Sequence, residues 1–273
     1  MSSRLPPAAA MPPSLVPTQP PGPPAAPTRA AVTAPAVTAL GALMAAATVG
    51  ESRLPAAWVP APLARILVGL GARVRSTDTG VTVRGRGLGG LAEPTAPLDV
   101  AASPDGPVLL PPLAGLLATQ PILVVILGPA DMDLPADLIE VLMRVGARPR
   151  AAGEGRRSPL SIQGTAAPVA LDLGADPPPS ITPAGALAAV AAGLNSPGET
   201  RVPLPAPLAE ALAALLTAFG VPARIAAGPS PPADDGPVHL CLTGEVETRP
   251  VDIPAGDRRF VPFRPSPQDP GTP

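Results

Sequence analysis

Three segments of the chain, LARILVGLGARV (63–74), LIEVLMRVGARP (138–149) and LAALLTAFGVPA (212–223), share one apolar pattern. In each, apolar side chains stand eight, five, four and one residues before a glycine, which is the spacing of one buried face of a helix. The glycines Gly71, Gly146 and Gly220 are about 75 residues apart. A glycine at this place is typical of a helix end in the left-handed region. The pattern therefore predicts three equivalent helices.

Each of these helices is followed by a segment that reads as two extended strands. In the first, RVRS and VTVR flank the turn Thr-Asp-Thr-Gly, and PLSIQG and VHLCLTG close the other two pairs. A second helical segment precedes each unit's main helix, at 37–48, 108–118 and 183–194. The unit predicted is strand, helix, strand, helix and hairpin. We expect an α/β domain of three βαβαββ units with pseudo-threefold symmetry, helices inside and sheets outside.

Composition limits the chemistry that the chain can carry out. The 273 residues include three Phe, one Trp and no Tyr, so the core must be built from close aliphatic packing. All 19 cationic residues are arginine, which excludes a lysine Schiff base and a P-loop lysine. The net charge of −2 comes without an acidic or basic block, so we expect neither nucleic acid nor a membrane as a partner.

The two ends of the chain are rich in proline and differ from the middle. Residues 1–34 have no sustained apolar stretch and predict a disordered leader instead of a signal peptide. Residues 251–273 predict a similar disordered tail, which leaves 35–250 as the domain. No run of 18 apolar residues is free of proline or charge, so we expect a cytoplasmic protein.

Two isolated motifs each allow two interpretations. Cys241 and His239 would lie on one face of a strand as a thiol–imidazole pair, but a small buried thiol is the simpler interpretation. Gly85, Gly87 and Gly90 match the spacing G-x-G-x-x-G of a dinucleotide loop. Since no helical pattern follows them, a tight crossover between units is favoured. We predict no cofactor.

Two charged groups also allow two interpretations. Arg156 and Arg157 lie in the turn of the second hairpin and could hold a phosphate, although a solvated turn is favoured. Asp131, Asp133 and Asp137 could suggest a metal site. Acidic residues at a helix start explain them more simply, because they interact favourably with the helix dipole. We predict no metal.

Several motifs resemble those of the enolpyruvate transferase family, and within it the EPSP synthases. GLGARV followed by GVTVRGRGLGGLAEPTAPLDV is similar to the family's LRALGAEV and WRVHGVGVGGLAEPxDxLDxGNSGTA. AGLNSPGET and ETRPVDIPAGD are similar to AGLNAPGxT and xxRPxDIxVPGDPSSAAF. The resemblance covers about residues 35–257. It implies the predicted fold and a family reaction in which phosphoenolpyruvate and shikimate 3-phosphate bind in a cleft between two domains.

The family's ligand-binding positions are mostly changed in this chain. The resemblance leaves three hydroxyl residues as residual substrate-binding positions, Thr38, Ser103 and Thr182, and no catalytic residue. Asp133 lies in the segment where the family carries a phosphoenolpyruvate-binding arginine. Apolar residues stand where the family has other cations: Pro35, Leu40, Val108 and Ala186.

These changes leave two hypotheses for the function. In the first, the chain is an EPSP synthase-like protein without catalytic activity, in which phosphoenolpyruvate and shikimate 3-phosphate are not bound. The former inter-domain face could then bind a protein partner. In the alternative, the chain is one half of a split, active EPSP synthase, because it ends near the family's PGDPSSAAF segment and a second chain would supply the other domain.

Overall fold

The computed structural model describes residues 29–175, 181–227, 237–257, 259 and 260. Its first part contains α1 (Arg29–Ala46), β1 (Gly50–Leu54), η1 (Ala56–Trp58), α2 (Ala61–Gly69), β2 (Arg73–Thr77) and β3 (Gly80–Gly85). Its second part contains β4 (Leu98–Asp99), α3 (Gly106–Ala118), β5 (Leu123–Leu127), α4 (Ala136–Val145), β6 (Arg148–Ala151), α5 (Ala152–Gly155) and β7 (Arg157–Gln163). Its third part contains α6 (Pro183–Gly193), β8 (Glu199–Pro205), α7 (Ala206–Ala218), β9 (Ala223–Ala226) and β10 (Pro237–Thr243).

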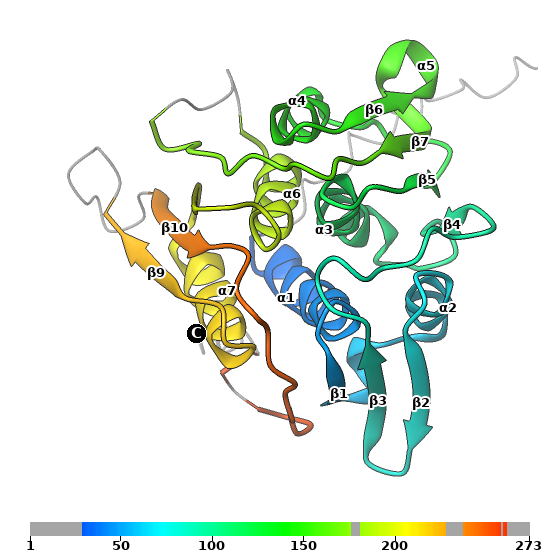
Figure 1. The fold of residues 1–273 in the computed structure, drawn as a ribbon, viewed down its shortest axis with the longest axis vertical. Helices are drawn as coiled ribbons and strands as arrows, with labels where there is room; N and C mark the ends of the chain where they lie inside the picture. The colour runs from blue at the N-terminus through cyan, green and yellow to red at the C-terminus, as the bar shows by residue number, and fades with distance from the viewer. Residues whose placement is uncertain (1–28, 176–180, 228–236, 258, 261–273) are drawn as a thin grey trace, which may run out of the picture.

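Helices α1, α3 and α6 lie side by side in the middle of the molecule (Figure 1). Residues 185–193 of α6 and 109–118 of α3 are all buried, so both helices are covered on every side. Such helices need no polar face, which explains why their sequences are almost entirely Ala, Leu, Val, Gly and Pro. These helices are the second helical segments that the sequence predicts.

The three central helices run in the same direction. Gly115 of α3 lies against Ala188 of α6, and further along the side chain of Asn195, after α6, donates a hydrogen bond to the carbonyl of Thr119, after α3. Both contacts join residues with nearly the same separation in sequence, as parallel helices require. The close approach at Gly115 is possible because this residue has no Cβ.

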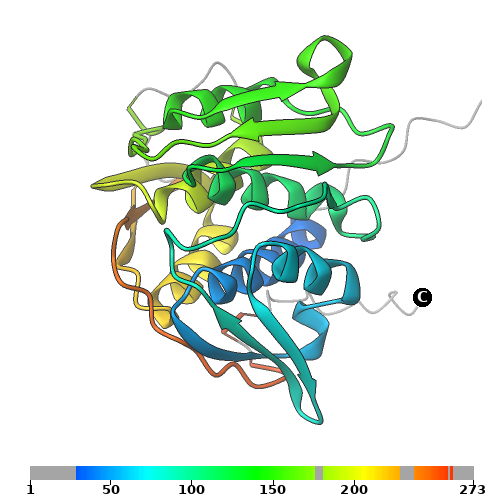
Figure 2. The same ribbon diagram turned by 45° about the vertical axis from the view of Figure 1, so that its right-hand side comes forward.

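Three sheets surround these helices, as the sequence predicts (Figure 2). Their strand orders are β1-β3-β2, β4-β5-β7-β6 and β8-β10-β9. In each unit, the strand after the central helix pairs antiparallel with the second strand of the hairpin. That second strand also pairs with the first strand of the hairpin. Helices α2, α4 and α7, which carry the Gly71, Gly146 and Gly220 pattern, pack against their own hairpins.

The first strand of the first unit comes from the other end of the chain. In the second unit, β4 runs parallel to β5, and in the third, Asp172 forms a parallel bridge with Arg201 of β8. In the first unit the equivalent parallel bridge joins Asp252 to Arg53 of β1. The first unit is thus completed by residues 251–253, about 200 positions away in sequence.

Both expected boundaries of the domain need correction where the structure describes them. Val251, Ile253 and Phe260 are buried, so residues 251–257, 259 and 260 belong to the folded domain and not to a disordered tail. The prolines of this segment do not prevent Val251 and Ile253 from packing beside β1, because the backbone of both residues hydrogen-bonds Arg53. At the other end, α1 begins at Arg29, within the expected leader. Residues 1–28 and 261–273 lie outside the described residues.

Two sets of glycines occupy places that another residue would not fit. Gly71, Gly146 and Gly220 have φ of 89°, 109° and 85°, which confirms the predicted left-handed helix ends. Gly85, Gly164 and Gly244 stand at the end of the last strand of each unit or directly after it. They lie against backbone carbonyls at the end of the unit's central helix, and a Cβ on any of them would overlap those oxygens.

Gly164→Ala is expected to lower the free energy of unfolding by about 3 kcal/mol, because the Cβ would overlap backbone carbonyls of Leu117 and Gln120 that cannot rotate away. Urea unfolding measures the effect. Gly89→Ala is the matched control: its Cβ would have no neighbour within 4 Å, so stability should change by less than about 0.5 kcal/mol. Equal effects of the two substitutions would contradict the packing argument.

Acid is expected to loosen the segment that ends at Phe260, whose ring packs edge-on to Trp58 at 5.9 Å between centroids. Hydrogen bonds from Arg259 lower the pKa of Asp257 below its ordinary value of 3.8, so this carboxylate stabilises the turn above that value and loses its contribution as the pH falls through the lowered pKa. The fluorescence emission of Trp58, the one tryptophan of the chain, should shift to longer wavelength as the pH falls through this lowered pKa.

Asp257→Asn should remove the acid transition and leave the segment weakened at neutral pH. Phe260→Ala should give the shifted emission at every pH, because the ring that covers Trp58 is gone. An unchanged Trp58 emission in Phe260→Ala would contradict the packing of this segment.

Candidate functional site

The three hydroxyl residues predicted from the sequence all belong to the central helices. Thr182 is the N-cap of α6, Ser103 lies in the turn before α3, and Thr38 lies within α1. Because these helices run in the same direction, Ser103 and Thr182 lie at one end of the bundle, where α3 and α6 begin, whereas Thr38 is the tenth residue of α1. Backbone N–H groups without partners collect at that end, and the helix dipoles favour negative charge there.

The three hydroxyls do not form a common site. Thr38 Oγ1 donates a hydrogen bond to the carbonyl of Pro35 in the same helix, at 3.1 Å. Ser103 is buried, and its backbone carbonyl accepts a hydrogen bond from the N–H of Gly106 at the start of α3. Thr182 is the one of the three with a charged partner. Within the described residues, none of the three contacts another.

The partner of Thr182 is the carboxylate of Asp137, in the first turn of α4. Thr182 N donates to Asp137 Oδ2 at 2.6 Å, and Thr182 Oγ1 lies 2.9 and 3.1 Å from the two carboxylate oxygens. Asp137 is 5% exposed, and a Cβ on Gly185 would overlap its Oδ2. A buried carboxylate of the chain itself therefore occupies the anion-favouring end of α6.

Asp137 lies in the first turn of α4, where the predicted favourable interaction with the dipole of that helix is possible. None of the acids Asp131, Asp133 and Asp137 is the N-cap of α4, which is Pro135, and Asp137 also accepts hydrogen bonds from Thr182, the N-cap of α6. Asp133 forms an exposed ion pair with Arg157, with 3.5 Å between Oδ1 and Nε. A cap between residues 45 positions apart has no local sequence signal.

Of the four positions where the resemblance places cations, Leu40 and Ala186 are part of the core, and Pro35 and Val108 are partly buried. Leu40 is fully buried, Ala186 is 2% exposed, and Val108 packs against the core from a partly buried position. No guanidinium or ammonium group could reach solvent from the place of Leu40 or Ala186 without opening the packing of α1 or α6.

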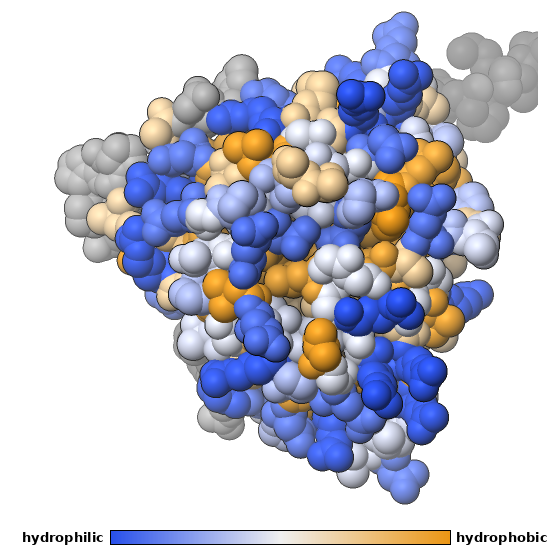
Figure 3. Space-filling view, in the orientation of Figure 1, coloured by the Kyte–Doolittle hydropathy of each residue, from blue (hydrophilic) through white to orange (hydrophobic). Residues whose placement is uncertain are grey.

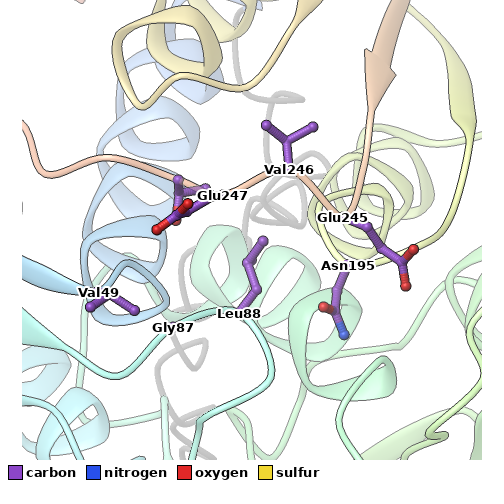
Figure 4. A pocket seen from close by; sticks show the side chains of 8 residues that line it. Val49, Gly87, Leu88, Asn195, Glu245, Val246 and Glu247 are labelled. Atoms are coloured by element: carbon purple, nitrogen blue, oxygen red, sulfur yellow. The ribbon is translucent and has the colours of Figure 1, made fainter.

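A hollow of about 430 Å³ lies at the opposite end of the bundle, where α1 and α6 end (Figure 4). Its lining includes Val49, Leu88, Asn195, Glu245 and Glu247, and no lysine or arginine. Two carboxylates and the negative ends of helix dipoles make this hollow unfavourable for phosphate or carboxylate ligands.

Other candidate centres from the sequence have structural explanations. Cys241 is buried in the middle strand of its sheet, between Arg201 and Arg224 in register. A hydrogen bond with Cys241, and next the charge of Asp172, raise the pKa of Arg201 above its ordinary value.

Among the described residues, no three His, Cys, Asp or Glu side chains gather in a way that could hold a metal ion. No helix in the same part of the chain is long and apolar enough to cross a membrane.

Comparison with known sequences adds an independent observation. The chain is 33% identical over 200 residues to a 3-phosphoshikimate 1-carboxyvinyltransferase of Rhodospirillum rubrum, a match that covers 70% of this chain and 42% of that enzyme. It is 35% identical over 189 residues to the enzyme of the same name from Parvibaculum lavamentivorans, covering 67% of this chain and 39% of that enzyme. The chain thus matches less than half the length of these relatives. No protein-family model matches it.

Solved structures show the same fold. An EPSP synthase from Acinetobacter baumannii superposes with a TM-score of 0.63 at 22% identity, over 80% of this chain and 46% of the other. The enolpyruvyl transferase NikO from Streptomyces tendae superposes with a TM-score of 0.53 at 19% identity, over 81% and 49%.

Together the fold and the sequence similarity define the class: the chain belongs to the enolpyruvate transferase family. Within this family, its similar curated sequences are 3-phosphoshikimate 1-carboxyvinyltransferases, the EPSP synthases. The resemblance stated from the sequence motifs is thereby confirmed.

Asp137→Ala is expected to destabilise the domain by about 2–3 kcal/mol, because it leaves the N–H and hydroxyl of Thr182 without their partner inside the protein. Thermal or urea unfolding measures this loss. Asp133→Ala is the control, since its ion pair with Arg157 is exposed and should contribute less than about 1 kcal/mol. A loss at Asp133 as large as that at Asp137 would contradict the assigned cap.

Proposed function

We propose that this chain is an EPSP synthase-like protein that does not catalyse the family reaction. In that reaction the enolpyruvyl group of phosphoenolpyruvate is transferred to shikimate 3-phosphate, a step of aromatic amino acid biosynthesis. The names of the similar curated proteins support the relationship. The inactivity is our inference from the residues at the central helices. A cytoplasmic location and the absence of a cofactor remain predictions.

The single observation that carries the proposal is the buried carboxylate of Asp137 at the start of α6. Both family substrates carry phosphate and carboxylate groups, and a fixed negative charge repels such groups where they should bind. Asp137 also uses the N–H and hydroxyl of Thr182, so these donors are no longer free for a ligand.

The loss of cationic positions supports the same conclusion. Charge-assisted hydrogen bonds to phosphate contribute about 1.5–3 kcal/mol each, and several together are needed to hold two polyanions in reacting positions. Leu40 and Ala186 cannot provide such bonds, and both are buried in the packing of the bundle. The hydroxyl of Thr38 can donate a hydrogen bond but cannot neutralise a phosphate.

A split enzyme, completed by a second chain, is the alternative function. It would need cations on this half of the cleft as well as on the other half. Leu40, Ala186 and Asp137 therefore argue against the alternative in the same way. A protein partner at the N-terminal end of the central helices agrees with either hypothesis.

The purified chain is expected to release no inorganic phosphate from phosphoenolpyruvate and shikimate 3-phosphate, because its central helices offer no anion clamp. In a bacterial strain without EPSP synthase, it should not restore growth on medium lacking aromatic amino acids. The Rhodospirillum rubrum enzyme on the same plasmid is the positive control. Growth with this chain alone would overturn the proposal, and growth only with a second expressed chain would support the split enzyme.

A further inference from the structure

The outer face of the first sheet carries a group of arginines. Val81 and Val83 of β3 are buried, so the alternate residues Thr82 and Arg84 face away from the core. Arg73 and Arg75 of β2 lie directly opposite Arg84 and Thr82. Figure 3 shows hydrophilic side chains crowded over this part of the molecule, where β2 and β3 lie in Figure 1.

These residues enclose a small hollow, which we call the arginine hollow. Its volume is about 50 Å³, and it is lined by Glu51, Arg73, Arg75, Thr82 and Arg84. Glu51 of β1 lies opposite Arg84 on the other side of β3. Three arginines and one carboxylate leave two positive charges around a space of this size.

The polar groups of the arginine hollow lack protein partners. Within the described part of the chain, no hydrogen bond or ion pair is made by the side chains of Arg73, Arg75 or Arg84. Thr82 is only 7% exposed, yet its hydroxyl makes no hydrogen bond among the described residues either. By contrast, the neighbouring Arg53 is paired with Asp252 at 3.4 Å.

The third sheet has the same framework without the excess charge. Its residues Arg201 and Arg224 lie on either side of Cys241, as Arg53 and Arg75 lie on either side of Thr82. There, however, Glu199 pairs with both arginines, at 3.6 and 2.8 Å.

The second sheet has two of the corresponding arginines but not the third. Arg148 lies opposite Gln163, and Arg150 lies opposite Ser161. A glutamine thus stands where the first sheet has Arg84. Among the described strands, three unpaired arginines meet around one largely buried threonine in the first sheet alone.

Like charges directly opposite each other in an antiparallel pair destabilise a sheet, so the Arg73–Arg84 pair costs stability in the free protein. A bound anion offsets the repulsion between these arginines. Arginine guanidinium groups present planar pairs of donors that match the oxygens of phosphate, and a threonine hydroxyl adds a donor at the base of the hollow.

We propose that the arginine hollow binds a phosphate group, as the dianion of inorganic phosphate or of a small phosphomonoester. The two net positive charges balance the charge of the dianion. The hollow lies on the outer face of a sheet, whereas the proposed loss of the family activity concerns residues of the inner helices. Either conclusion can therefore fail without the other.

Isothermal titration with inorganic phosphate at pH 7.5 in 150 mM NaCl tests the site. We expect saturable binding at one site and a higher unfolding temperature in phosphate. Arg73→Ala/Arg84→Ala should weaken binding at least tenfold, which corresponds to about 1.4 kcal/mol. Thr82→Val should also weaken it, about threefold or more, at unchanged net charge and nearly unchanged shape.

Arg148→Ala/Arg150→Ala is the matched control, since it removes the same amount of charge from β6, the strand of the second sheet that corresponds to β2. It should change phosphate affinity less than twofold. An equal loss of phosphate affinity in the control would show that the effect depends only on net charge, and would overturn the proposed site. The absence of saturable binding up to 10 mM phosphate would overturn it as well.

Two further ligands distinguish the sources of the phosphate group. Glucose 6-phosphate should bind through the same residues, as a small phosphomonoester. A ten-nucleotide single-stranded DNA should bind no more tightly than phosphate, because the hollow holds one group. Tight DNA binding that is lost in Arg73→Ala/Arg84→Ala would assign the surface to nucleic acid and overturn the proposal.

Discussion

The close packing of three parallel helices at the centre of the molecule is the constraint on which the rest of the structure depends. Residues 185–193 of α6 are buried on all sides, and Gly115 of α3 lies directly against Ala188. Small residues permit this distance, and the core then lacks room for larger side chains. Gly85, Gly164 and Gly244 extend the same constraint outward, because each lets the end of a sheet approach the carbonyl end of a central helix.

This packing also explains how a scaffold can persist while its chemistry changes. Leu40 and Ala186 add to the core at positions where the resemblance expects charged groups, and Asp137 satisfies the donors at the start of α6. At Leu40 and Ala186, side chains that pack inside the protein stand where the resemblance expects groups that bind a ligand. In the proposed inactive protein, the stability of the bundle and the loss of the anion site have the same physical cause.

The three sheets show how one framework can carry different surfaces. Inward-facing residues such as Val81 and Val83 are fixed by the core, whereas outward-facing residues are free to vary. In the third sheet, Glu199 and Asp172 together balance the charges of Arg201 and Arg224. In the first, the equivalent acid, Glu51, lies opposite a third arginine and leaves an excess of positive charge.

The sequence by itself determined the helices, the hairpins and the family, because local spacing carries them. Apolar residues before Gly71, Gly146 and Gly220 specify a helix face and its end, and the alternation in RVRS and VTVR specifies a strand pair. The sequence also indicated which positions have lost charged groups, through comparison of motifs that lie close together in the chain.

Only the tertiary structure decided which distant residues meet. The cap of Thr182 by Asp137, the completion of the first unit by residues 251–253 and the packing of Phe260 on Trp58 join segments 45 to about 200 residues apart. The arginine hollow needs strand register as well, since a shift of one residue would turn Arg84 to the core side. Contacts of this kind are set by the shared core that holds the segments together, and local sequence patterns do not predict them.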